Sequence, residues 1–209
     1  MDILPLGHSS FKLKGKSVTL VTDPFDSTFT GLKFPKHTAC DIVTVSHDHK
    51  DHNEVTQLEG DPFVVRGAGE YDIKGVDIIA ISTEHGGDVP EKNTIYRIEM
   101  EDLNIVHLGD LGRLLTSAEI DLLDGVDILF VPVGGTYTID AAQAKKIIAE
   151  IEPKVVIPMH YDRPGLAIKN LAPVSIFLKE MEKEQVVAQP KLSISKGKLP
   201  EEMQVVVLE

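Results

Sequence analysis

Four candidate metal ligands, His47, His49, Asp51 and His52, fall within the six residues 47–52. Imidazole nitrogens and carboxylate oxygens are common protein ligands of zinc and of other divalent metals. The run follows the apolar segment 41–46, so we expect these side chains to project from the end of a strand into one small volume. His47 and His49 are two residues apart and can face one ion, whereas Asp51 and His52 lie past the turn and can reach a second. The alternative, a solvated polar turn, is disfavoured because three of the eight histidines fall in it.

Further metal-competent residues follow in an order that resembles the metallo-β-lactamase superfamily. They occur in the segments Ser82-Thr83-Glu84-His85, Gly109-Asp110 and Pro158-Met159-His160-Tyr161. Asp23, followed by Pro24 and Phe25, matches an early aspartate that this superfamily places behind a histidine ligand to orient it. The motifs extend from residue 23 to residue 161, which is most of the chain. The resemblance implies an α+β fold, an αββα sandwich of two mixed β-sheets faced by helices.

The resemblance also implies a metal-dependent hydrolase that binds two divalent ions. The first ion would be held by His47, His49 and His85, the second by Asp51, His52 and His160, with Asp110 as a bridge between them. A hydroxide held between two such ions forms near neutral pH and attacks the bond to be hydrolysed. Asp51 and Asp110 would therefore serve catalysis by holding the ions. The nitrogen-rich ligand set favours zinc, and the carboxylates also admit manganese or iron.

A narrower resemblance links the chain to the branch that contains ascorbate-6-phosphate lactonase. It rests on Leu6-Gly7-His8-Ser9-Ser10-Phe11, on Asp23-Pro24-Phe25 and on Pro158-Met159-His160-Tyr161. The present chain is shorter than that lactonase, so loops that select its substrate can be missing. This resemblance therefore does not identify the substrate.

One more histidine, His8, is expected to have a different role. The ligand set implied by the resemblance is complete without it, so we expect His8 to donate a proton to the leaving group or to hydrogen-bond the substrate. The alternative is a structural histidine that caps the first turn. His107, inside the apolar run 105–108, is expected to form hydrogen bonds in the core rather than to bind metal. Segment 134–137 follows another expected strand and is a candidate wall of the substrate site.

Length and composition indicate one compact domain over residues 1–209. The apolar runs have the length of strands, and none approaches the ~20 residues of a membrane span. The amino terminus has no basic segment ahead of an apolar stretch, so no secretory signal is expected. Cys40 is the only cysteine, which excludes an intramolecular disulfide and fits a reducing compartment. We therefore expect a cytoplasmic protein that does not act at a membrane.

The net charge of −12 argues against nucleic acid as the substrate, because phosphate backbones are bound by clustered lysines and arginines. Nuclease branches of the superfamily also carry a large inserted domain, for which residues 111–153 leave no room. The chain lacks the C-terminal helical domain of glyoxalase II thioesterases, and Asp51 rather than cysteine at the second site disfavours a β-lactamase. A small intracellular molecule with a lactone, ester or phosphoester bond is favoured. The alternatives are a nucleic-acid phosphodiesterase and a non-catalytic metal-binding protein, and the oligomeric state is open.

Short strands alternate with amphipathic helices along the chain. Thr116 and Glu119 form a capping box that predicts a helix start, Asp140 opens a second helix, and residues 174–181 carry an apolar stripe at helical spacing. The tail is expected to form a hairpin of residues 192–195 and 204–208 around the turn 196–198. Strands rich in valine and isoleucine are expected at residues 3–6, 9–13, 17–22, 41–46, 76–81, 94–99, 104–108, 127–133 and 154–158.

Overall fold

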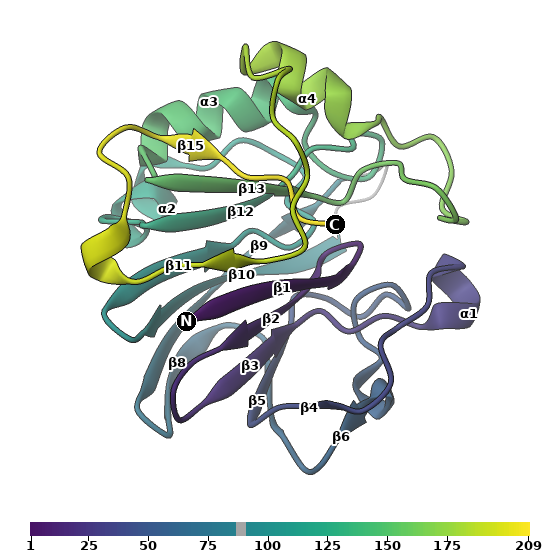
Figure 1. The fold of residues 1–209 in the computed structure, drawn as a ribbon, viewed down its shortest axis with the longest axis vertical. Helices are drawn as coiled ribbons and strands as arrows, with labels where there is room; N and C mark the ends of the chain where they lie inside the picture. The colour runs from purple at the N-terminus through teal and green to yellow at the C-terminus, as the bar shows by residue number, and fades with distance from the viewer. Residues whose placement is uncertain (87–90) are drawn as a thin grey trace.

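The first of two β-sheets that pack face to face has six strands, in the order β14-β1-β2-β3-β5-β7 (Figure 1). The computed structural model describes residues 1–86 and 91–209. Strands β14, β1, β2 and β3 are antiparallel neighbours, whereas β3, β5 and β7 run parallel, so the sheet is mixed. The strands are β1 (Asp2–Gly7), β2 (Ser10–Lys14), β3 (Thr19–Thr22), β5 (Ile42–Val45), β7 (Phe63–Arg66) and β14 (Leu192–Ser193).

The second sheet is also mixed and has seven strands, in the order β15-β13-β12-β11-β10-β9-β8. Strands β15, β13, β12 and β11 are parallel, and β10, β9 and β8 continue the sheet as antiparallel neighbours. Every residue of the central strand β12 is buried, as expected for a parallel strand covered on both faces. The strands are β8 (Gly69–Ile73), β9 (Val76–His85), β10 (Glu91–Met100), β11 (Leu103–His107), β12 (Ile128–Pro132), β13 (Val155–Met159) and β15 (Gln204–Val205).

Three helices cover the outer face of the seven-stranded sheet: α2 (Ser117–Leu122), α3 (Ala141–Ile151) and α4 (Val174–Glu180). The capping box of Thr116 and Glu119 is present at the start of α2, as predicted. Asp140 caps α3 in the same way. The one-turn helix α1 (Ser27–Thr30) and the two-stranded sheet of β4 (Thr38–Ala39) and β6 (Leu58–Glu59) lie beside the six-stranded sheet (Figure 1).

Two apolar cores hold the layers together. Phe11 and Leu13 of the first sheet meet Tyr96 and Ile98 of the second in the core between the sheets. Strand β10 alternates, so Ile95 points to the opposite face and joins the core beneath the helices. The predicted α+β sandwich of two mixed sheets is confirmed, with most of the helical layer on one side.

The predicted C-terminal hairpin is wrong. Strand β14 pairs with β1 at the edge of the first sheet, whereas β15 pairs in parallel with β13 in the second sheet. The expected turn at Lys196–Lys198 is a single turn of 3₁₀ helix that carries the chain from one sheet to the other. The tail therefore ties the two sheets together.

All the strands that lead into the predicted ligands run in one direction within each sheet. Antiparallel pairing through β2 gives β1 the direction of β3 and β5, and pairing through β10 gives β9 the direction of β11 and β13. The carboxyl ends of these six strands therefore meet along one edge of the sandwich, which brings distant parts of the chain to one place. Among the helices of the described residues, none is both long and apolar enough to cross a membrane.

Candidate metal centre

The first predicted ligand group, His47, His49 and His85, comes together at this edge. The candidate ligand atoms of the three side chains all lie within 4.8 Å of one another. His47 Nε2 and His49 Nδ1 are 3.1 Å apart, and His85 follows as the last residue of β9. The expected strand alternation is not the cause, because β5 ends at Val45 and both histidines lie in the turn after it. That turn is folded back on itself, since His49 O accepts hydrogen bonds from the backbone of His52 and Asn53.

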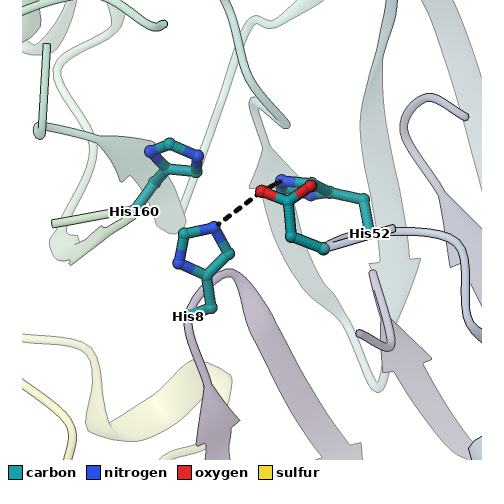
Figure 2. Close-up of side chains that lie close together, drawn as sticks. His8, His52 and His160 are labelled. Carbon is teal, nitrogen blue, oxygen red and sulfur yellow. Dashed lines mark ion pairs between the residues drawn. The ribbon is translucent and has the colours of Figure 1, made fainter. Parts of the chain in front are cut away.

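The second predicted group, Asp51, His52 and His160, also comes together, and His8 lies within it. The candidate ligand atoms of these four residues are within 4.8 Å of one another. Figure 2 shows the rings of His8, His52 and His160 close together. His8 Nε2 lies 3.3 Å from Asp51 Oδ2. The ring centroids of His8 and His160 are 4.3 Å apart. His8 is therefore placed with the second ligand group.

Asp110 lies between the two groups and contacts members of both. Its Oδ2 is 3.3 Å from His85 Nε2 and 3.8 Å from His47 Nε2 on one side. On the other side it is 3.2 Å from His52 Nε2 and 3.0 Å from His160 Nε2. This is the position that a carboxylate shared by two ions needs.

Asp23 forms a hydrogen bond with the candidate ligand His52 and orients its ring, as predicted. Its Oδ2 accepts a hydrogen bond from His52 Nδ1 at 2.8 Å, and its two oxygens also accept from the backbone and hydroxyl of Ser46 at 2.8 and 2.6 Å. Because Nδ1 of His52 donates to Asp23, Nε2 is the ring nitrogen that faces Asp51 and Asp110, and it is the atom that would bind a metal ion. Asp23 is fully buried, and the imidazole of His52 keeps its pKa low although burial alone would raise it.

Replacing Asp23 is expected to weaken metal binding without removing a ligand. In Asp23→Asn the acceptor of the His52 proton loses its charge, so we expect zinc affinity to fall about 10- to 100-fold. Competition with a chromophoric chelator measures this affinity. Asp72→Asn is the control, because it removes the same charge from an exposed position near the far end of the β8–β9 hairpin. Equal affinities in the two variants would contradict the role of Asp23.

Two residues outside the predicted ligand set, Asn93 and Gly109, position Asp110. The side chain of Asn93, on β10, accepts from the backbone N–H of Asp110 at 3.0 Å and donates to Leu108 O at 3.0 Å. A Cβ on Gly109 would lie 2.3 Å from Asn93 Oδ1, and Gly109 has φ +55°, so only glycine allows this close approach. Asn93 gave no sequence signal because it is one polar residue within a strand.

His107 is buried and hydrogen-bonded, as predicted. Its Nε2 contacts Ser9 O at 2.9 Å, and its Nδ1 accepts from the backbone N–H of Gly109 at 3.2 Å. One neutral imidazole therefore connects the residue after His8 with the residue before Asp110. This contact fixes the β1–β2 turn against the end of β11.

Three residues of the centre adopt a left-handed backbone conformation that side chains other than glycine rarely take. His8 has φ 52°, Asp23 φ 38° and His160 φ 52°. Such conformations cost about 1–3 kcal/mol each, and they persist where surrounding contacts impose them. All three strained residues have their side chains at the centre, so the strained backbone occurs where these side chains are positioned.

Burial and the close carboxylates set the charge states of the centre. Burial lowers the pKa of His47 to about 3 and that of His8 to about 4, so both imidazoles are neutral at pH 7 and keep lone pairs. Burial would raise the pKa of Asp110, but His160 and His52 hold it well below its usual range. Although burial opposes protonation of His52, Asp110 and Asp51 raise its pKa well above the usual value. The centre thus offers ionised carboxylates, the neutral imidazoles of His47 and His8, and two imidazoles, His52 and His85, whose pKa Asp110 raises against the effect of burial.

Several buried polar atoms of the centre fit a bound cation. Within the described residues, His52 Nε2, Asp110 Oδ1 and both ring nitrogens of His8 have no hydrogen-bond partner in the protein. A buried polar atom without a partner costs about 1–3 kcal/mol, and a divalent ion is one group that satisfies such lone pairs. The residues present therefore fit bound divalent metal.

A cavity of about 580 Å³ opens onto this centre. His49, Asp51, His85, Asp110 and His160 line it, so members of both ligand groups face the same space. Its apolar walls include Phe29 and Tyr137, which are 47% and 37% exposed. Tyr137 is the one residue of segment 134–137 that lines this cavity, so the prediction of a wall from that segment holds for Tyr137. The remaining residues of the segment, 134–136, line a separate cavity.

The fold and this centre define a metal-dependent hydrolase of the metallo-β-lactamase type. The chain belongs to the β-lactamase superfamily, because the family model described as "Beta-lactamase superfamily domain" matches residues 2–160. The superfamily and the enzyme class predicted from the motifs are thereby confirmed. The narrower likeness to ascorbate-6-phosphate lactonase stays a prediction.

Relatives from several organisms agree with this assignment. A UPF0173 metal-dependent hydrolase of Staphylothermus marinus is 30% identical over 187 residues, which cover 75% of this chain and 82% of that protein. Another, of Methanopyrus kandleri, is 26% identical over 193 residues, which cover 77% and 84%. A candidate zinc-dependent hydrolase of the same superfamily from Thermotoga maritima is 37% identical in sequence, with a TM-score of 0.81 over 99% of this chain and 97% of that one.

Proposed function

We propose that this protein is a binuclear metallohydrolase that acts on a lactone, ester or phosphoester bond of a small molecule. The observation that carries the proposal is the place of Asp110, whose Oδ2 lies within 3.8 Å of imidazole nitrogens from both ligand groups. His47, His49 and His85 would hold one ion, and Asp51, His52 and His160 the other. Zinc suits the nitrogen ligands best, and manganese or iron is the alternative.

Two divalent ions at this place would supply a hydroxide at neutral pH and polarise the bond under attack. The protein side chains would attract the ions and hold the ligands in position. Asp51 and Asp110 are largely buried, which strengthens their attraction for cations. Asp23 fixes the ring of His52, and Asn93 fixes the backbone of Asp110.

His8 is proposed to serve the reaction rather than to bind an ion. Its Nε2 faces Asp51 at 3.3 Å, and its ring centroid lies 4.3 Å from that of His160 and 5.5 Å from that of His52. A histidine at this place can hydrogen-bond the substrate or pass a proton to the leaving group, which contributes about 10²- to 10⁴-fold in rate where it operates.

A small molecule is favoured over nucleic acid as the substrate. The cavity has the size of an ordinary ligand site, about 300–1,000 Å³, and the chain has a net charge of −12, which repels a polyphosphate backbone. Residence in the cytoplasm is likewise proposed, with the single cysteine, Cys40, as its support.

A metal-dependent activity screen tests this function. The protein is stripped with a chelator, reloaded with zinc, manganese or iron, and assayed with chromogenic esters, lactones, phosphomonoesters and phosphodiesters. We expect hydrolysis by the reloaded protein and none by the stripped protein. Activity on oligonucleotides alone would favour the nucleic-acid phosphodiesterase, and metal binding without any hydrolysis would favour the non-catalytic alternative.

A further inference from the structure

The cavity at the metal centre is also lined by two lysines, Lys50 and Lys169. Lys50 lies in the turn between His49 and Asp51, and Lys169 lies in the segment after His160. Both are exposed, and within residues 1–86 and 91–209 neither forms an ion pair with a carboxylate. The chain as a whole has a net charge of −12, so two such lysines at one cavity stand out against its overall acidic character.

The helix α1 holds the two lysine-bearing segments in place. At its start, Asp26 N–H donates to Lys50 O at 2.8 Å, and at its end Thr30 O accepts from Ala167 N–H at 2.7 Å. The segment passes so close that a Cβ on Gly31 would lie 2.7 Å from Gly165 O. The lysines are therefore carried by a framework that fixes their backbones relative to each other.

Three carboxylates also line the cavity, Asp48, Asp51 and Asp110. Asp51 and Asp110 belong to the ligand set and are neutralised when divalent ions are bound. The third carboxylate, Asp48, is 3.7 Å from Arg66 and accepts a hydrogen bond from Asn53 at 2.6 Å. With these carboxylates paired in this way, the two lysines and the bound ions would make the cavity attractive to anionic ligands.

We propose that the substrate carries an anionic carboxylate or phosphate group, which Lys50 and Lys169 bind, and an apolar part that contacts Phe29 and Tyr137. This inference rests on the proposed function, since it takes the cavity at the metal centre as the substrate site. The two lysines select the substrate by its charge, and they hold it so that the bond to be cleaved faces the ligand groups. Neutral esters of the same shape bind less tightly.

Binding of a non-hydrolysable pair of probes tests the proposal. The metal-loaded protein is titrated calorimetrically with 4-phenylbutanoate and with the neutral 4-phenylbutanamide, which has nearly the same shape. We expect the carboxylate to bind at least about tenfold more tightly, because charge-assisted hydrogen bonds exceed neutral ones. The ratio of the affinity for the carboxylate to the affinity for the amide should fall about fivefold in Lys50→Met and in Lys169→Met. It should fall further in the double variant.

Two controls separate the lysines from other effects. Lys183→Met removes the same charge from an exposed position outside the cavity and should leave the ratio unchanged. Metal content is measured in every variant, because a carboxylate also contacts the ions and that contribution must stay constant. Raising the salt concentration should lower the ratio in the unmodified protein and have little effect on the double variant.

The result that overturns the proposal is an equal ratio in the unmodified protein and in the double variant. A lack of any carboxylate preference, or of any carboxylate binding at millimolar concentration, overturns it as well. These titrations need no turnover, so they are independent of the hydrolysis screen. Carboxylate selection by the lysines together with no hydrolysis would leave the binding site in place and reject the proposed function alone.

Discussion

Asp110→Asn is expected to release metal from both ligand groups and to abolish hydrolysis. One carboxylate oxygen of Asp110 faces His47 and His85 in the first group and His52 and His160 in the second. The amide of asparagine has nearly the same shape but no charge, so both ions lose an anionic ligand at once. Loss of supporting interactions around a metal costs about 10- to 100-fold in affinity, and loss of a shared ligand should cost more.

Elemental analysis after dialysis, together with the rate on the best substrate of the screen, measures this effect. Asp127→Asn is a matched control, because Asp127 is also a buried carboxylate, but it contacts Asn104 and Lys196 away from the centre. We expect this control to lose some thermal stability and to keep its metal. Loss of only one ion from Asp110→Asn would show that the carboxylate is not shared.

His8→Ala and His160→Ala are expected to differ in whether they lose metal as well as turnover. His160 is a proposed ligand, and its Nε2 lies 3.0 Å from Asp110 Oδ2, so its replacement should lower both metal content and turnover. His8 is proposed to act on the substrate, so its replacement should keep the metal and reduce the turnover rate about 10²-fold or more. Metal content, thermal stability and rate are measured on both variants.

The comparison also tests whether His8 binds metal, because His8 lies with Asp51, His52 and His160 in one group of candidate ligand atoms. Metal loss in His8→Ala would therefore make His8 a further ligand of the second ion. Unchanged metal and unchanged turnover would instead return it to a structural role in the β1–β2 turn. Each outcome assigns one role.

Local signals in the sequence predicted most of the centre. The run from His47 to His52 holds so many candidate metal ligands that the sequence alone identifies it as part of a metal site. The capping boxes at Thr116 and Asp140 are equally local, because each depends on residues three apart. Both ligand groups came together with the predicted members, although the cause is a folded turn after β5 rather than strand alternation.

Long-range pairing was not predicted. The tail residues of β14 and β15 alternate like a hairpin, but their partners β1 and β13 are more than forty residues away in the chain and belong to different sheets. Strand alternation fixes which face is buried and does not choose the neighbour. His8 was expected near the centre, but its place within the second ligand group was not predicted, since only the packing of the β1–β2 turn against β11 brings it beside His160.

The most direct test of the central claim is a metal titration followed by turnover in the same sample. Stripped protein receives zinc or manganese in steps, and bound metal and hydrolysis are recorded at each step. We predict saturation at about two ions per chain, with full activity only when both are bound. Saturation at one ion with full activity, or no binding at all, would contradict a shared binuclear centre.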